Sequence, residues 1–113
     1  MIFKICSQSE WQDACAEGLY HGAPIDLQDG FIHFSAAHQV RATAAKHFTG
    51  LPGLVLVAFD EDLLGESLKW EPSRGGDLFP HLYGTLQTEL AVWVVDLPLD
   101  ANGQHVFPED IEA

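Results

Sequence analysis

The sequence predicts an α+β fold with a mixed or mostly antiparallel sheet and two helices in its N-terminal half. Both segments with helical spacing lie before residue 50, and most strand-like runs follow them. Strands and helices do not alternate regularly, which disfavours a doubly wound parallel sheet. A length of 113 residues fits one domain over 1–113, with a core of about 2–97 and an acidic tail over 98–113.

The first strand and the first helix are expected within residues 2–18. Ile2–Cys6 alternates in polarity, as a short strand does. Ser7 followed by Glu10 has the spacing of a capping box, so a helix is expected to begin there. Gly18 supplies a stop for that helix. Three of its side chains share an apolar face: Trp11, Ala14 and Cys15.

Residues 19–29 show no period and are expected to form a loop that ends in the turn Asp29-Gly30. Phe31–Ser35 then predicts a strand. Because side chains alternate along a strand, one face should carry Phe31, His33 and Ser35.

A second helix is expected after Ser35, which can cap it. Lys46 and His47 fall in its last turn, where positive charge suits the helix dipole, and Gly50 follows its end. Its apolar stripe holds Ala37, Val40, Ala44 and Phe48.

The second half of the chain predicts mainly strands. Gly53–Phe59 is continuously apolar and should be buried on both faces. Leu68–Glu71 is a short strand closed by Pro72, and Ser73–Asp77 is the most flexible stretch. Phe79–Leu86 is irregular to extended.

Two segments complete the chain. Glu89–Leu97 is strongly apolar and predicts a strand whose Leu90–Val95 part is central in a sheet. The acidic end after Pro108 should fray.

Composition limits the partners. Seventeen acidic residues against five basic ones give a net charge of −12, which argues against nucleic acid and anionic membrane. No apolar run approaches the ~20 residues of a membrane-spanning helix. The N-terminus lacks the features of a signal peptide, so we expect a cytoplasmic protein. Cys6 and Cys15 are expected to be small buried hydrophobes.

His33 is the first candidate for chemistry. It shares a strand face with Ser35, close to a helix start whose free N–H groups suit an anionic or carbonyl-bearing ligand. The alternative is a half-buried histidine that holds a backbone carbonyl, with Ser35 as an ordinary cap. Both interpretations remain open.

Two further motifs carry candidate side chains. In Phe79–Gly84, the ring of Tyr83 can stack on a heterocycle, although the segment can also be a packed loop. Glu71 can accept a proton or stabilise a developing positive charge. Its alternative is a surface carboxylate paired with Arg74 or Lys69.

Six histidines raise the question of a metal, but no zinc spacing is present and we predict no metal. The third and least favoured hypothesis is a metal-dependent hydrolase in which His33, His81 and Glu71 come together in the folded protein. Classical nucleotide-binding and serine-hydrolase motifs are absent.

The chain resembles the bacterial domain-of-unknown-function 952 family over about residues 2–97. That family looks similar in fold to the ADP-ribosyltransferases, which split NAD at its nicotinamide bond. The segments that carry the resemblance are Ile5, Asp29–Ser35, Leu68–Glu71 and Leu78–Gly84.

The resemblance implies roles for named residues. His33 would hold a ribose hydroxyl of NAD beside Ser35, and Tyr83 would stack on nicotinamide. Glu71 or Glu89 would stabilise the oxocarbenium-like ribose. The resemblance further implies that His81 replaces a basic residue that binds phosphate. Arg74 is also expected to be a cofactor-binding residue.

Two main function hypotheses follow. The first is an enzyme that acts on NAD, as a substrate, or on an ADP-ribose derivative. The second is a non-catalytic module that binds a nucleotide, a small molecule or a peptide in the same pocket. They differ in one requirement, since only the enzyme needs a carboxylate within reach of a ligand between His33 and Tyr83. No protein partner is identified.

Overall fold

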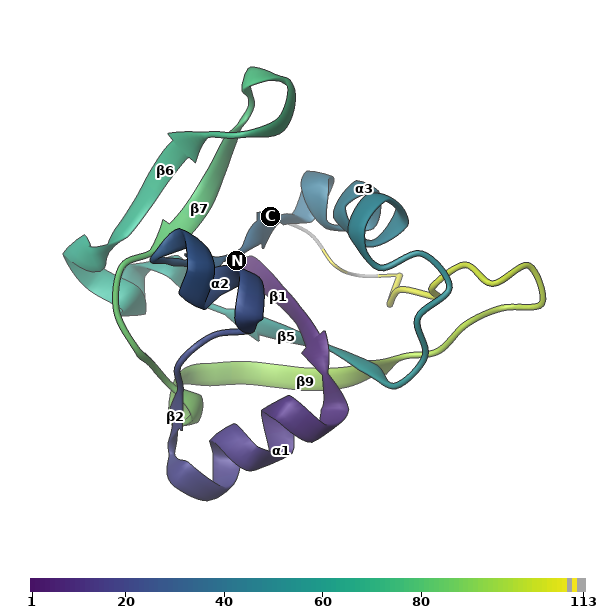
Figure 1. Cartoon of the computed structure of the whole chain (residues 1–113), viewed down its shortest axis with the longest axis horizontal. Coiled ribbons are helices and arrows are strands. Elements are labelled where there is room, and N and C mark those ends of the chain that lie inside the picture. The colour runs from purple at the N-terminus through teal and green to yellow at the C-terminus, as the bar shows by residue number, and fades with distance from the viewer. Residues whose placement is uncertain (110, 112–113) are drawn as a thin grey trace.

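In the computed structural model, the chain forms short strands and helices around one large antiparallel sheet (Figure 1). It describes residues 1–109 and 111, without the side chain of Arg74. The elements are β1 (Ile2–Ser7), α1 (Gln8–Glu17), β2 (Leu19–Tyr20), α2 (Pro24–Asp29), β3 (Ile32–His33), β4 (Ser35–Ala36), α3 (Ala37–His47), β5 (Leu54–Phe59), η1 (Glu61–Ser67), β6 (Leu68–Pro72), η2 (Arg74–Gly76), β7 (Leu78–Leu82), β8 (Leu86–Gln87), η3 (Thr88–Leu90) and β9 (Ala91–Leu97).

The α+β class is confirmed, with antiparallel pairing throughout the described residues. The strands form three sheets, in the orders β4-β1-β5-β9, β2-β8 and β3-β7-β6. The helices α1, α2 and α3 all precede residue 50, but they are three and not two. That the fold is like that of the ADP-ribosyltransferases stays a prediction. No helix in the described part of the chain combines the length and apolar character needed to cross a bilayer.

The strands β1 and β5 form the centre of the largest sheet, and apolar side chains pack on both of its faces. Every residue of β5 is buried, as its continuous apolar run predicts. One face packs against α1, β2, β3 and β7, and the other packs against α3. The prediction that 90–95 is central is wrong, because β9 is the edge strand and exposes Val92 and Val94.

The helix α1 begins and ends where the sequence predicts. The backbone N–H of Glu10 donates to Ser7 Oγ at 3.1 Å, and Gly18, at φ 87°, closes the helix through its N–H to the Ala14 carbonyl. Trp11 and Ala14 are buried. Cys15 is exposed, contrary to expectation, because it lies on the solvent flank of the short buried stripe.

The predicted loop over 19–29 contains β2 and α2. Pro24 occupies the first turn of α2, and Asp26 Oδ2 accepts the backbone N–H of Ala23 at 2.8 Å. Six residues are too few to show a helical period, and Ile25 and Leu27 are exposed. The residue that α2 buries is Asp26, so hydrophobic patterning could not reveal this helix.

The predicted strand 31–35 divides between two sheets, because β3 pairs with β7 and β4 pairs with β1. Ser35 does not cap α3. The cap is Ala36, whose side chain has no acceptor; its N–H donates to Gln39 Oε1 at 2.9 Å, the half of a capping box that the third helical residue supplies. The stripe Ala37, Val40 and Ala44 is buried as expected.

The strands β6 and β7 form a hairpin that projects from the body of the molecule (Figure 1). The segment after Leu78, expected to be irregular to extended, is a strand up to Leu82, with Pro80 inside it. The Pro80 carbonyl accepts the N–H of Phe34 at 3.0 Å, which extends the backbone contact with β7 beyond the end of β3.

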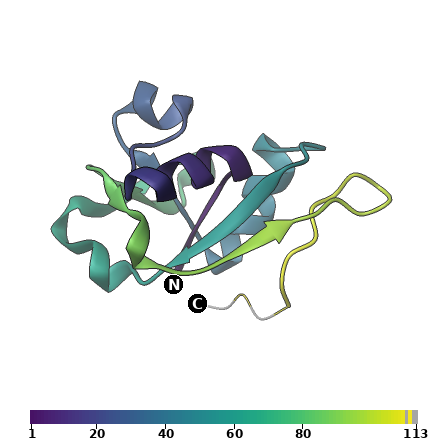
Figure 2. The same cartoon turned by 90° about the horizontal axis from the view of Figure 1, so that it is seen from below.

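The tail extends past the end of β9 as a loop and then turns back (Figure 2). Leu99 and His105 form an isolated bridge, and Ile111 is 5% exposed in the core beside α3. The expected fraying after Pro108 is therefore wrong at Ile111, whose apolar side chain packs into the core. Asp110, Glu112 and Ala113 lie outside the described residues.

The substitution Gly22→Ala should destabilise the protein by about 3 kcal/mol. Gly22 has φ +117°, and an added Cβ would lie 2.7 Å from Asp26 Cβ. Urea unfolding measures the loss. Gly103→Ala is the matched control, because its φ is +77° but nothing lies within 4 Å of its added Cβ. A loss of about 1 kcal/mol is expected for the control; equal losses would contradict the steric role of Asp26.

Candidate functional site

The two histidine motifs meet across neighbouring strands. His33 of β3 lies directly opposite His81 of β7, and Lys69 of β6 lies opposite His81 on the other side. Directly opposed residues in antiparallel strands point to the same face of the sheet. Glu71, opposite Phe79, lies two residues along β6 and therefore shares this face. The segments 30–35 and 79–84 are thus brought together.

Four rings form an aromatic cluster, defined as Phe31, His33, His81 and Tyr83. The Phe31 ring stacks on His81 with centroids 4.1 Å apart and planes at 27°. It also lies 4.6 Å from the His33 ring and 5.3 Å from the Tyr83 ring. Phe31 was not predicted as a site residue, although its alternation with His33 was the available signal.

Glu71 is held by two members of the aromatic cluster. The Tyr83 hydroxyl donates to Glu71 Oε1 at 2.7 Å, and His81 Nδ1 lies 2.9 Å from the same oxygen. These hydrogen bonds, first from Tyr83 and then from His81, lower the pKa of Glu71. The carboxylate in turn raises the pKa of Tyr83. Among the described side chains, Glu71 pairs with His81 and Tyr83 and not with Lys69, and the Arg74 side chain lies outside the described residues.

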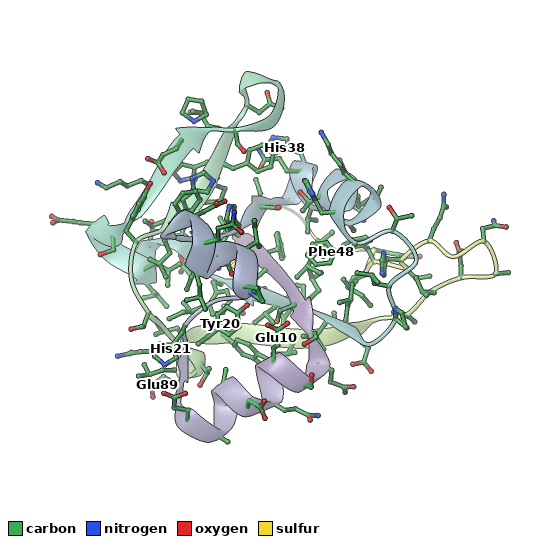
Figure 3. The ribbon with its side chains drawn as sticks, in the orientation of Figure 1. Glu10, Tyr20, His21, His38, Phe48 and Glu89 are labelled. Carbon is green, nitrogen blue, oxygen red and sulfur yellow. The ribbon has the colours of Figure 1, made fainter. Side chains whose placement is uncertain are left out.

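Glu89, the other candidate carboxylate, lies elsewhere. It belongs to η3, which follows the strand that pairs with β2. In Figure 3 it appears in the same part of the molecule as His21, well away from the β6–β7 hairpin. The carboxylate that the fold brings to the aromatic cluster is therefore Glu71.

Exposure separates the side chains that a ligand can touch from those behind them. Tyr83 is 41% exposed, and the side chains of Glu71 and His33 are about one third exposed. His81 is only 5% exposed, beneath the Phe31 ring. His81 therefore orients Glu71 from behind, and Tyr83, Glu71 and His33 form the accessible surface.

A buried carboxylate fixes His33 from the other side. Asp26 Oδ1 accepts the backbone N–H of His33 at 3.1 Å and lies 2.6 Å from His33 Nδ1. Its Oδ2 accepts from Lys4 Nζ and from Ala23 N, both at 2.8 Å. Asp26 is 2% exposed and Lys4 is 5% exposed. Asp26 was not predicted as a site residue because it lies in a segment that was expected to be a loop. The available signal was Lys4, a lysine on the inward face of β1, because a buried lysine needs an acidic partner.

Burial alone would raise the pKa of Asp26, but the hydrogen bonds of His33 and Lys4 outweigh it and lower the pKa from 3.8 to about 2. The other ring nitrogen of His33, Nε2, lies 3.0 Å from Asp29 Oδ2. His33 is thus half-buried and held by the protein itself, as its alternative interpretation expects, but its partners are two carboxylates and not a backbone carbonyl.

A cavity of about 480 Å³ is lined by His33 but by no other member of the aromatic cluster. Ser35 lines it and is 4% exposed, with Oγ 3.0 Å from Thr43 Oγ1. The Arg74 side chain lies outside the described residues. Among the described side chains, no group of three or more His, Cys, Asp or Glu residues is placed to hold a metal ion.

The substitution Lys4→Met should destabilise the protein by about 3–5 kcal/mol, because it leaves Asp26 buried without its cation. Urea unfolding at neutral pH measures the loss. Lys69→Met is the matched control, since Lys69 is exposed, and about 0.5 kcal/mol or less is expected for it. Unfolding of Lys4→Met at the wild-type urea concentration would contradict a stabilising ion pair.

Asp26 also predicts a pH dependence. Its pKa is lower in the folded chain than in the unfolded one, so its stabilisation is complete above about pH 4 and is lost as the pH falls towards about 2. Unfolding followed over this range should show that loss in the wild type. The loss should be smaller in Lys4→Met, whose Asp26 has a higher folded-state pKa.

The substitution Tyr83→Phe should raise the pKa of Glu71 towards its ordinary value of 4.5, because it removes the leading hydrogen bond. Carbon NMR of the Glu71 carboxyl during a pH titration measures the change. Trp70→Phe, on the opposite face of β6, should leave the titration of Glu71 unaltered. An unmoved titration in Tyr83→Phe would show that the hydroxyl does not hold the carboxylate.

Comparisons with known proteins agree with this fold. A family profile described as "Protein of unknown function (DUF952)" matches residues 5–94. The crystal structure of protein CC0527 from Caulobacter crescentus is 50% identical, with 93% of this chain and 92% of that chain covered and a TM-score of 0.90.

The solution NMR structure of CC0527 is 51% identical over 91% of this chain and 89% of that one, with a TM-score of 0.83. No curated protein matches the chain. The matched profile spans most of the sequence, including β3, β6 and β7. The chain therefore belongs to the DUF952 family of proteins of unknown function.

Proposed function

We propose that Glu71 and the aromatic cluster bind a nucleotide such as NAD or ADP-ribose, and that Glu71 acts on its ribosyl bond. The observation that carries the proposal is the placement of Glu71. Its Oε1 is held by Tyr83 and His81, on the sheet face that also carries His33. A carboxylate between a stacking ring and a ribose-binding histidine is what the enzyme hypothesis requires.

Each accessible side chain has a role that fits its surroundings. The Tyr83 ring, 41% exposed, offers a face on which a heterocycle stacks. Asp26 holds His33 Nδ1, and a ribose hydroxyl takes the place of Asp29 Oδ2 at His33 Nε2. Lys69 is exposed and lies opposite His81, on the same strand as Glu71. It is the cation that can contact a phosphate of the ligand.

The lowered pKa of Glu71 favours one of its two predicted roles. A carboxylate that stays ionised at neutral pH is a weak proton acceptor but stabilises positive charge well. When the N-glycosidic bond of NAD breaks, its electron pair leaves with neutral nicotinamide and positive charge develops on the ribose. Water then attacks the anomeric carbon and releases one proton, which yields ADP-ribose.

A non-catalytic binding module remains the second candidate, because a specific observation favours it. The chain holds five Lys and Arg residues. Lys4 is committed to Asp26, and Arg41 contacts the Phe107 ring and the Pro108 carbonyl. Cations for a diphosphate are therefore scarce, and a ligand held by stacking and hydrogen bonds alone fits the same surface.

Amide chemical-shift titrations with NAD, ADP-ribose and nicotinamide test binding. The expected shifts centre on His33, Ser35 and Tyr83, and are lost in His33→Ala. Binding weaker than millimolar, which is about −4 kcal/mol, for all three ligands would overturn the nucleotide proposal.

Nicotinamide release from NAD tests catalysis. Glu71→Gln should lower the rate by about 100-fold or more and leave NAD binding nearly unchanged, because the charge is needed chiefly in the transition state. Glu89→Gln is the matched control and should behave as wild type. Binding without release in the wild type would assign the pocket to the non-catalytic module.

A further inference from the structure

The cavity that His33 lines contains no other member of the aromatic cluster and has its own chemistry. It lies between α2 and α3, against the part of β1 that follows Phe3, and Ser73 of the hairpin turn also lines it. The strand β4 pairs with β1 only at Ile2 and Phe3, so beyond Phe3 the described β1 has a strand partner on its β5 side alone. Figure 1 shows α2 and α3 on either side of this part of β1.

One wall of the cavity is apolar and aromatic. Phenyl faces attract cations through their electron-rich π systems and also pack against hydrocarbon. A volume of about 480 Å³ is in the range of pockets that hold small organic molecules. The apolar residues that line it are Phe3, Ile5, Ile25, Phe34, Phe48 and Phe79.

The polar wall offers negative charge. Lys4 and Asp26 both line the cavity, but their 2.8 Å ion pair is buried and neutralises both charges. Asp29 is 37% exposed, and its Oδ2 contacts His33 Nε2 at 3.0 Å. Within the described residues, its Oδ1 has no hydrogen bond or ion pair. Asp29 therefore presents a carboxylate oxygen to a ligand.

The long-range field has the same sign. A net charge of −12 raises the local concentration of cations around the molecule and disfavours anions. Among the described residues that line the cavity, Lys4 is the only Lys or Arg, and it is already paired. The negative field and the Asp29 oxygen favour a cationic group, and the phenyl wall favours an apolar or aromatic body that carries it.

We infer that this cavity binds a small organic cation, namely an ammonium group on an apolar or aromatic body. The ammonium group hydrogen-bonds Asp29, and the body lies against the phenyl wall. The inference does not rest on the proposed nucleotide function. The cation is held by Asp29 and the apolar lining, whereas the nucleotide contacts Glu71 and Tyr83, and His33 and Ser35 border both.

A charge series on one skeleton tests the inference in the intact protein. The probes are phenethylamine, phenethyl alcohol and hydrocinnamate, which carry positive, zero and negative charge. Amide-shift titrations should show phenethylamine binding about tenfold more tightly than the alcohol, as a charged hydrogen bond implies, and no saturable binding of hydrocinnamate. Added salt should weaken the amine and leave the alcohol unchanged.

Two variants locate the ammonium group. Asp29→Asn should remove most of the tenfold preference for the amine. Asp13→Asn removes an equal charge from the exposed face of α1 and should retain that preference. Equal affinities across the series, no amine binding at millimolar concentration, or equal losses in the two variants would each overturn the inference. The wild-type series alone decides the outcome if Asp29→Asn does not fold. Nicotinamide release and NAD shifts at Tyr83 report separately on the nucleotide proposal.

Discussion

The carboxylate of Asp26 organises the side of the molecule where both candidate sites lie. A charged group at 2% exposure is unfavourable unless it is fully hydrogen-bonded, and Asp26 meets this condition with four contacts. Those contacts join β1, the start of α2 and β3 at one point. The position of α2, the close approach of Gly22 and the orientation of His33 all follow from this carboxylate.

His33 is the element that the two sites share. Its backbone N–H and Nδ1 face Asp26, its Nε2 faces Asp29, and its ring lies 5.4 Å from His81. A side chain held from three directions has little rotational freedom, which is the condition for a preorganised contact with a ligand. The aromatic cluster and the cavity that His33 also lines are thus both set by one fixed ring.

The sequence predicts the fold where local rules act and fails where contacts are distant. The caps of α1, the buried strand β5 and the stripe of α3 follow from spacing and were predicted correctly. α2 was missed because its inward residue is an aspartate paired with a lysine twenty-two positions earlier. The edge position of β9 depends on sheet order, which an apolar run does not encode.

The candidate site follows the same division. His33, Glu71 and Tyr83 were recognised by residue type, and strand pairing brings them together. The sequence did not decide whether Glu71 or Glu89 is the acting carboxylate, because only the register of the hairpin places one of them beside the aromatic cluster. Asp26, Asp29 and Phe31 were not predicted as site residues, because their importance comes from neighbours in space.

The attachment of the β6–β7 hairpin has a consequence for how the site is lost and regained. Glu71, His81 and Tyr83 all belong to this arm, which pairs with β3 through two residues, whereas β5 pairs along its whole length with β1 and β9. We expect such an arm to open at a lower free energy than the central sheet. Local opening of this hairpin would then limit the lifetime of the assembled site, and the binding surface would be lost while the central sheet stays folded.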